Sequence, residues 1–177
     1  TDLTGLVLWI EPVEEGEPWR LVPFCWLPDD SLQRKEELDR VPYLAWRAAG
    51  YLDTTPGRAV SKLQVALKLA QLAEHFEIQS VAFDRWRIED FKALAADNGV
   101  ELPPMEPFGQ GYQSMSPALE AMETHLLNGT VEHPAHPILT WCAANAVVVS
   151  DAAENRKLSK DKATGRIDLM VAAVMGA

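Results

Sequence analysis

The apolar segments nearest the start of the chain have the composition of two β-strands. The stretches "GLVLWIEP" (residues 5–12) and "PWRLVPFCWLP" (residues 18–28) are rich in β-branched and aromatic residues, and the polar segment "VEEGE" separates them. Two such runs around a short glycine-containing segment are typical of a β-hairpin. The sequence therefore predicts two antiparallel strands joined by a turn.

A charged helix is predicted from residue 31 to near residue 40, where Pro42 stops it, and a short helical turn follows to Gly50. The clearest amphipathic helix begins after Ser61, which is spaced from Gln64 as a capping box. Apolar residues then recur on one helical stripe at i, i+4, i+7 and i+11, namely Val65, Leu69, Leu72 and Phe76.

A strand, "SVAF" (residues 80–83), and a helix over residues 87–98 follow, with Gly99 ending the helix. The proline- and glycine-rich stretch "ELPPMEPFGQGYQSMS" predicts an ordered loop with at most one brief strand. Ser116 and Pro117 are expected to be the N-cap and first residue of the next helix, which runs to Leu127.

The last third of the chain predicts a short extended piece near Val131, then a buried helix from residue 136 whose end turns β-like in composition. A basic loop leads into a final apolar helix, "RIDLMVAAVMGA", with Asp168 in its first turns. Strands alternating with helices in this order predict an α/β fold, a mixed sheet flanked by helices.

The composition fits one soluble globular domain of 177 residues, with 47% hydrophobic and 24% charged residues. Cys25 and Cys142 lie far apart without metal-ligand spacing, which favours buried thiols in a reducing compartment over a disulfide. No apolar run approaches the roughly 20 residues of a membrane span, and "TDLTGLVLWIEP" lacks a signal-peptide pattern. We therefore expect a soluble, unprocessed protein that does not enter a membrane.

Positive charge is concentrated in one segment of an acidic chain. The formal net charge is -10, yet "NRKLSKDKATGR" (residues 155–166) carries a single acid, Asp161, among five basic residues: Arg156, Lys157, Lys160, Lys162 and Arg166. The overall charge disfavours a surface that binds DNA everywhere. The run itself is compatible with a solvated loop or with local phosphate contacts.

Two aspartates are candidates for chemistry. Asp84 follows "VAF" at the carboxyl end of a predicted strand, the edge where α/β sheets collect ligands, although an aspartate there can also cap the next helix. Asp168 lies in an apolar helix, where a carboxylate needs a partner or a metal, or else interacts favourably with the helix dipole. Carboxylates from distant segments can together bind Mg²⁺ or Mn²⁺.

Other sequence motifs give weaker evidence of a metal-binding or catalytic site. His133 and His136 are three residues apart in "HPAHP", but two prolines and the lack of acidic or thiol neighbours disfavour a metal site. The sequence contains no Walker A loop, GxGxxG, CxxC pair or Ser-His-Asp pattern.

The sequence resembles the nuclease domain of the large terminase subunits of tailed bacteriophages, the DNA-packaging motors. The resemblance rests on "TDLTGLVL", "GYLDTTPG", "FDRWRIEDFKALAADNGVELPPMEPFGQGYQSMSPALEAMETHLLNG", "HPILTWCAANAVV" and "DKATGRIDLMVA", which follow the family order over nearly the whole chain. The combination of "DRWRIEDFK", "FGQGYQSMSPA" and "KATGRIDLMVA" is specific.

This resemblance implies an RNase H-like fold and an endonuclease that cleaves concatemeric double-stranded DNA during head filling in the bacterial host cytoplasm, at the procapsid portal. It places the second and third acidic metal ligands at Asp84 and Asp168. The first ligand is expected on a strand upstream of Thr1, and Asp2 matches the turn aspartate of the family. Two Mg²⁺ or Mn²⁺ ions about 4 Å apart would activate water and stabilise the leaving 3′ oxygen.

The resemblance further implies that residues 1–177 form a single nuclease domain, a fragment of a longer protein that also has an ATPase domain. Double-stranded DNA, the portal and the small terminase subunit are the expected partners, and the basic run is placed to contact phosphates. Two alternatives remain open: a docking module of the packaging motor without catalytic activity, and another RNase H-like nuclease such as a junction resolvase.

Overall fold

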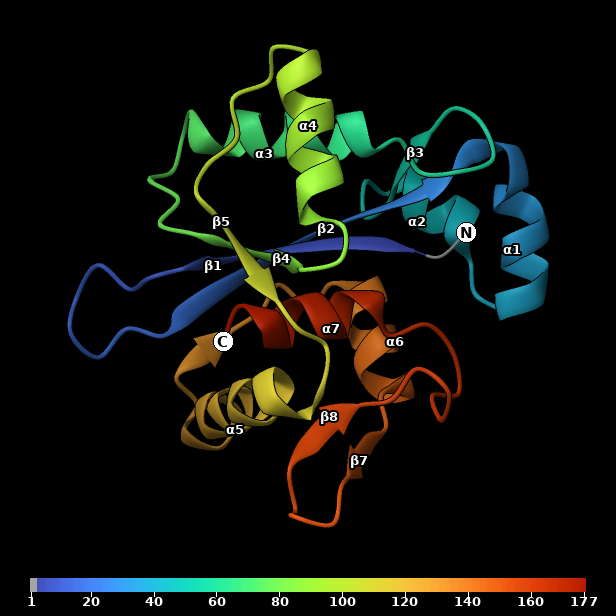
Figure 1. Ribbon diagram of the computed structural model, residues 1–177. Helices are drawn as coiled ribbons and strands as arrows, with labels where there is room; N and C mark the ends of the chain where they lie inside the picture. The colour runs from blue at the N-terminus through green and yellow to red at the C-terminus, as the bar shows by residue number, and fades with distance from the viewer. Residues whose placement is uncertain (1–2) are drawn as a thin grey trace. The chain divides into compact units, whose positions relative to one another are not determined.

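The computed structural model describes residues 3–177, so Asp2 lies outside the described part of the chain. The chain divides into two compact units, one formed by Thr1–Val60 with Gly111–Ala177 and the other by Ser61–Gln110. Figure 1 gives the course of the chain and the labels of its elements.

The larger unit is built on a four-stranded mixed sheet. β1 and β2 form the predicted antiparallel hairpin, in a register that runs from Thr4 opposite Trp26 to Ile10 opposite Arg20. β3 and β6 both pair with β2 in parallel. The strands are β1 (Thr4–Ile10), β2 (Trp19–Pro28), β3 (Asp53–Thr55) and β6 (Val131–Glu132).

Helices and a small antiparallel ribbon complete this unit (Figure 1). α7 packs against β1, and α5 and α6 pack against α7. The close approach of α7 requires Gly5, where a Cβ atom would lie 3.2 Å from Leu169 Cα. These elements are η1 (Asp29–Ser31), α1 (Leu32–Asp39), α2 (Tyr43–Ala48), α5 (Tyr112–Asn128), α6 (Pro137–Asn145), α7 (Asp168–Met175), β7 (Val148–Ser150) and β8 (Arg156–Leu158).

The predicted start of α5 is wrong. The helix begins at Tyr112 after Gly111, and Pro117 lies inside it. Burial of Met115 on the same stripe as Leu119 stabilises this earlier turn. Ser116 therefore caps no helix, and its Oγ instead accepts the backbone N–H of Arg156 at 3.1 Å.

The smaller unit contains two helices and two parallel strands: α3 (Lys62–Ala73), β4 (Val81–Asp84), α4 (Ile88–Asp97) and β5 (Met105–Phe108). Ser61 caps α3 as predicted, its Oγ accepting the Gln64 N–H at 3.4 Å. The stripe of α3 is buried at Val65, Leu69 and Leu72. Its last predicted member, Phe76, lies beyond the helix end and is 39% exposed.

Cys25 and Cys142 are both buried free thiols, as predicted. Burial raises the pKa of Cys142 to about 11, and burial likewise raises the pKa of Cys25. Both thiols are therefore protonated and unreactive at neutral pH. Within residues 3–177, no helix has the length and apolar character that a bilayer crossing requires.

His136 makes the stability of the larger unit depend on pH. Its Nδ1 accepts the Leu139 N–H at 3.4 Å and caps α6, and its ring lies against Tyr51. Burial lowers the pKa of His136, with a smaller opposing effect from a backbone hydrogen bond to Tyr51. The neutral ring therefore contributes stability above the unfolded pKa of about 6.5, and this contribution is lost as the pH falls through the lower folded pKa.

We expect His136→Asn to flatten the fall in melting temperature between about pH 7 and pH 5, because the asparagine side-chain oxygen can replace Nδ1 as the capping acceptor and has no proton to gain in this range. Thermal denaturation across this range checks the prediction. His75→Asn, at an exposed histidine, is the matched control and should retain the parental pH dependence. Equal slopes for the His136→Asn variant and the parent would contradict it.

Candidate active site

Asp84 is the last residue of β4 and lies opposite Phe108 of the parallel strand β5. Its Oδ1 accepts the Trp86 N–H at 3.0 Å, and its carbonyl oxygen accepts the Arg87 N–H at 3.0 Å. The carboxylate thus closes a turn at the carboxyl end of the strand, just before α4. This bond uses Oδ1 alone, so the turn is compatible with a ligand at Oδ2.

Asp168 is the first residue of α7, and its side chain is only 14% exposed. The Lys160 ammonium lies 2.8 Å from Asp168 Oδ1. A mostly buried carboxylate at a helix N-terminus is stabilised both by this cation and by the helix dipole. The burial that the sequence suggested is therefore accompanied by a specific charge partner.

Asn145 holds the segment that leads to Asp168. Its Nδ2 donates to the Arg166 carbonyl at 3.2 Å, and its Oδ1 accepts the Thr164 hydroxyl at 3.0 Å. Gly165 lies between these two residues, where a Cβ would come within 2.6 Å of Asn145 Nδ2. The amide of Asn145 and the missing side chain at Gly165 together fix the path of the chain into α7.

Arg166 forms a mostly buried hydrogen-bond network with Asp39 and Tyr43. Its Nε lies 2.5 Å from Asp39 Oδ2, and the same oxygen accepts the Tyr43 hydroxyl at 2.7 Å. Burial lowers the pKa of Arg166, but the bond to Asp39 and its negative charge outweigh this effect, so the guanidinium remains charged. Burial and the Asp39 carboxylate raise the pKa of Tyr43. Arg166 thus anchors α7 to α1 and α2.

The basic run is more structured than the predicted loop, because its first residues form β8 and pair with β7. Arg156 binds Glu123 at 2.8 Å, and the Lys157 ammonium lies 4.8 Å from the Tyr112 ring centroid. Lys160 and Arg166 bind the carboxylates described above. Lys162 is exposed, and the structure records no ion pair for it within residues 3–177.

The donor chemistry of the two aspartates fits a hard divalent cation, since both offer carboxylate oxygens at element ends. In the described part of the chain, no three His, Cys, Asp or Glu side chains gather closely enough to hold a metal. Asp84 belongs to the smaller unit and Asp168 to the larger. His133 Nδ1 accepts the Ala135 N–H at 3.2 Å, which closes a local turn.

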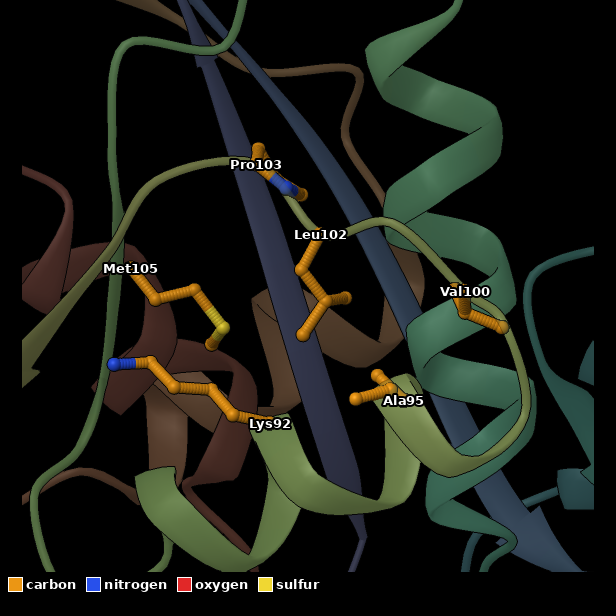
Figure 2. Close-up of a pocket in the computed structure, with 7 residues that line it drawn as sticks. Lys92, Ala95, Val100, Leu102, Pro103 and Met105 are labelled. Carbon is orange, nitrogen blue, oxygen red and sulfur yellow. The ribbon is translucent and has the colours of Figure 1, made fainter.

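An open cavity of about 270 Å³ lies in the smaller unit, between α4 and the segment that follows it. Figure 2 shows the residues that line it. Its lining is apolar apart from Lys92, whose ammonium lies 3.4 Å from Glu89. The other lining residues are Ala95, Ala96, Val100, Leu102, Pro103 and Met105. Its lining residues include no carboxylate, thiol, hydroxyl or imidazole side chain.

Two features of the site were missed by sequence reasoning. The Lys160–Asp168 ion pair joins residues eight apart across a bend, a spacing for which no helical or strand rule predicts contact. The Arg85 guanidinium lies 4.8 Å from the Trp86 ring centroid beside Asp84. The adjacent arginine and tryptophan in "FDRWRIEDF" were a sequence signal for this cation–π contact.

Comparison with known proteins gives consistent matches. A family model described as the endonuclease domain of the terminase large subunit matches residues 1–177. The large terminase subunit of Enterobacteria phage HK97 is 49% identical over 174 residues, which cover 98% of this chain and 34% of that protein. Protein YmfN of Escherichia coli (strain K12) is 24% identical over 182 residues, which cover 89% of this chain and 35% of that protein.

The crystal structure of the HK97 bacteriophage large terminase superposes with a TM-score of 0.92 at 46% identity, over 99% of this chain and 37% of that chain. This match confirms the predicted mixed α/β fold, and an RNase H-like architecture is consistent with it. The chain spans about a third of the length of the curated relatives it matches.

Proposed function

Because this chain belongs to the family of terminase large subunit endonuclease domains, we propose that it is a metal-dependent endodeoxyribonuclease of viral genome packaging. Its substrate would be concatemeric double-stranded phage DNA. The family match over residues 1–177, together with 49% identity to the HK97 subunit, carries this proposal. Family membership supports a packaging-related nuclease role.

In this proposal Asp84, Asp168 and an acid upstream of Thr1 would hold two Mg²⁺ or Mn²⁺ ions. When bound, such ions activate a water molecule and stabilise the leaving 3′ oxygen. Two observations support the assignment. Asp84 lies at a strand end with one oxygen used by its turn, and Asp168 already binds a cation, the Lys160 ammonium, at 2.8 Å.

The basic run would contact DNA phosphates beside this site, through Arg156, Lys157, Lys160, Lys162 and Arg166. The exposure and the ion pairs of these side chains indicate which of them are most available to DNA. Lys162 is exposed and Lys160 is half-exposed, whereas Arg166 is 18% exposed and bound to Asp39. We therefore assign the phosphate contacts first to Lys162 and Lys160, and we assign Arg166 a mainly structural role.

The chain would act as one nuclease domain within a longer protein that also contains an ATPase domain. That protein would work in the bacterial host cytoplasm, at the procapsid portal with the small terminase subunit. The shares of 34% and 35% that the chain covers in its relatives leave room for such a domain.

Plasmid nicking in Mn²⁺, by this chain and by its full-length protein, tests the proposal, with EDTA as the metal-free control. We expect Mn²⁺-dependent conversion of supercoiled plasmid to nicked and linear forms by the full-length protein. Cleavage confined to four-way junctions would favour a resolvase, and an absence of both Mn²⁺ binding and cleavage would favour a docking module.

Lys160 is expected to compete with the metal for Asp168. Replacing it with glutamine removes the ammonium at Asp168 Oδ1 and should tighten Mn²⁺ binding by about threefold, as expected from the ~0.2–1 kcal/mol of an ion pair whose ammonium is half-exposed. Calorimetric titration of Mn²⁺ into the full-length protein measures the change.

Lys162→Gln is the matched control, because it makes the same change in net charge two residues away without breaking a recorded ion pair. It should shift Mn²⁺ affinity less than Lys160→Gln. Identical shifts would mean that Lys160 acts only through net charge, and weaker Mn²⁺ binding by Lys160→Gln would contradict the competition outright.

A further inference from the structure

Three consecutive exposed side chains, Arg85, Trp86 and Arg87, lie between the end of β4 and the start of α4. Trp86 is 78% exposed. A single exposed apolar residue is ordinary on a protein surface; Leu127, at 87% exposed, is one in this chain. Trp86 differs from Leu127 because arginines lie on both sides of it.

The backbone of this segment is fixed by hydrogen bonds. The Arg85 N–H donates to the Phe108 carbonyl at 3.1 Å, and the Trp86 N–H donates to Asp84 Oδ1 at 3.0 Å. The Arg87 N–H donates to the Asp84 carbonyl at 3.0 Å. A ligand that binds these side chains would therefore find the backbone already ordered, which lowers the entropic cost of binding.

The two arginines have no recorded acidic partner. Within residues 3–177, the ion pairs involve neither Arg85 nor Arg87, although the whole chain carries a net charge of -10. The Arg85 guanidinium lies 4.8 Å from the Trp86 ring centroid, within the range of a cation–π contact. The segment thus offers an aromatic surface and two guanidinium groups for which no ion pair is recorded within residues 3–177.

This combination matches the chemistry of a nucleic-acid strand. Guanidinium groups bind phosphate oxygens in a bidentate geometry, and an indole ring stacks on bases. We propose that Arg85, Trp86 and Arg87 form a DNA-contact segment, in which the arginines bind backbone phosphates and Trp86 packs on a base or deoxyribose of the strand passing Asp84. The identity of the ligand as DNA rests on the proposed nuclease function.

The proposal is tested by measuring the binding of a short labelled DNA duplex to the full-length protein in EDTA. Fluorescence anisotropy reports the affinity at each of a series of salt concentrations. Trp86→Ala should weaken binding by about twofold to tenfold, because in a duplex the indole ring can pack only on a deoxyribose or on a terminal base, with little change in the salt slope. Arg85→Ala and Arg87→Ala should each weaken binding and lower the salt slope by about one.

Two substitutions serve as matched controls. Leu127→Ala removes an exposed apolar side chain, and Arg34→Ala removes an exposed arginine from α1; both should bind the duplex like the parent. Thermal denaturation confirms that each variant is folded, as expected for exposed positions. If Trp86→Ala binds like Leu127→Ala, or if the parent does not bind the duplex, the contact segment is refuted.

EDTA removes the divalent ions that the proposed cleavage requires, so DNA binding by the segment is measured separately from nuclease activity. A protein that binds DNA through Arg85 and Trp86 but never cuts it would retain the contact segment and lose the proposed activity. A protein that cuts DNA with Mn²⁺ but whose affinity is unchanged by all three substitutions would keep the activity and overturn the segment.

Discussion

Replacing Asp84 with asparagine is expected to lower Mn²⁺-dependent DNA cleavage by about 10²- to 10⁴-fold, which corresponds to several kcal/mol of lost transition-state stabilisation. Asparagine has nearly the same shape, and its amide oxygen can still accept the Trp86 N–H that Asp84 Oδ1 accepts at 3.0 Å. The substitution therefore preserves the turn and removes the negative charge that a divalent cation requires.

This variant separates the two roles that the sequence left open for Asp84. If the carboxylate serves only to close the turn, Asp84→Asn should cut DNA at the parental rate, whereas Asp84→Ala should lose stability. If the carboxylate is a metal ligand, both variants should lose cleavage and Mn²⁺ affinity. Asp90→Asn, at an exposed acid in the first turn of α4, is the control and should leave cleavage unchanged.

Elements whose stabilising contacts are local were predictable from the sequence. The β1–β2 hairpin and α3 are examples, because the acidic, glycine-containing segment between Ile10 and Trp19 and the Ser61 cap lie next to the residues they organise. β3 was missed, since its three residues become a strand only by pairing in parallel with β2. The start of α5 was misplaced because Ser116 and Pro117 look like a helix start, whereas burial of Met115 extends the helix backwards.

The residues of the candidate site likewise include some whose position the sequence predicts and some whose contacts it does not. The position of Asp84 at a strand end could be predicted from the apolar run before it, and the structure confirms that position. The partners of the basic run could not be predicted, because Arg156 binds Glu123 and Arg166 binds Asp39, 127 residues away in the sequence. A run of charges in a sequence does not reveal which of them are already neutralised by distant acids.

The network around Arg166 leads to the second large effect, on stability. Asp39→Ala should lower the free energy of unfolding by about 2–3 kcal/mol, less than the ~3–5 kcal/mol for a fully buried pair, because both side chains are about a fifth exposed. The loss arises because the substitution leaves the Arg166 guanidinium and the fully buried Tyr43 without their shared carboxylate acceptor. For a protein of this size, the melting temperature should fall by about 5–10 °C.

The Asp29–Arg47 pair provides a control in which the geometry is matched and the burial differs. Its Oδ1–Nη1 distance is 2.6 Å, close to the 2.5 Å between Asp39 and Arg166, but its side chains are 51% and 43% exposed. Asp29→Ala should therefore cost at most about 1 kcal/mol. Thermal denaturation of both variants compares them directly, and equal losses would mean that burial does not set the strength of the Arg166 network. A larger loss for Asp39→Ala, accompanied by weaker Mn²⁺ binding, would link this network to the position of Asp168 two residues beyond Arg166.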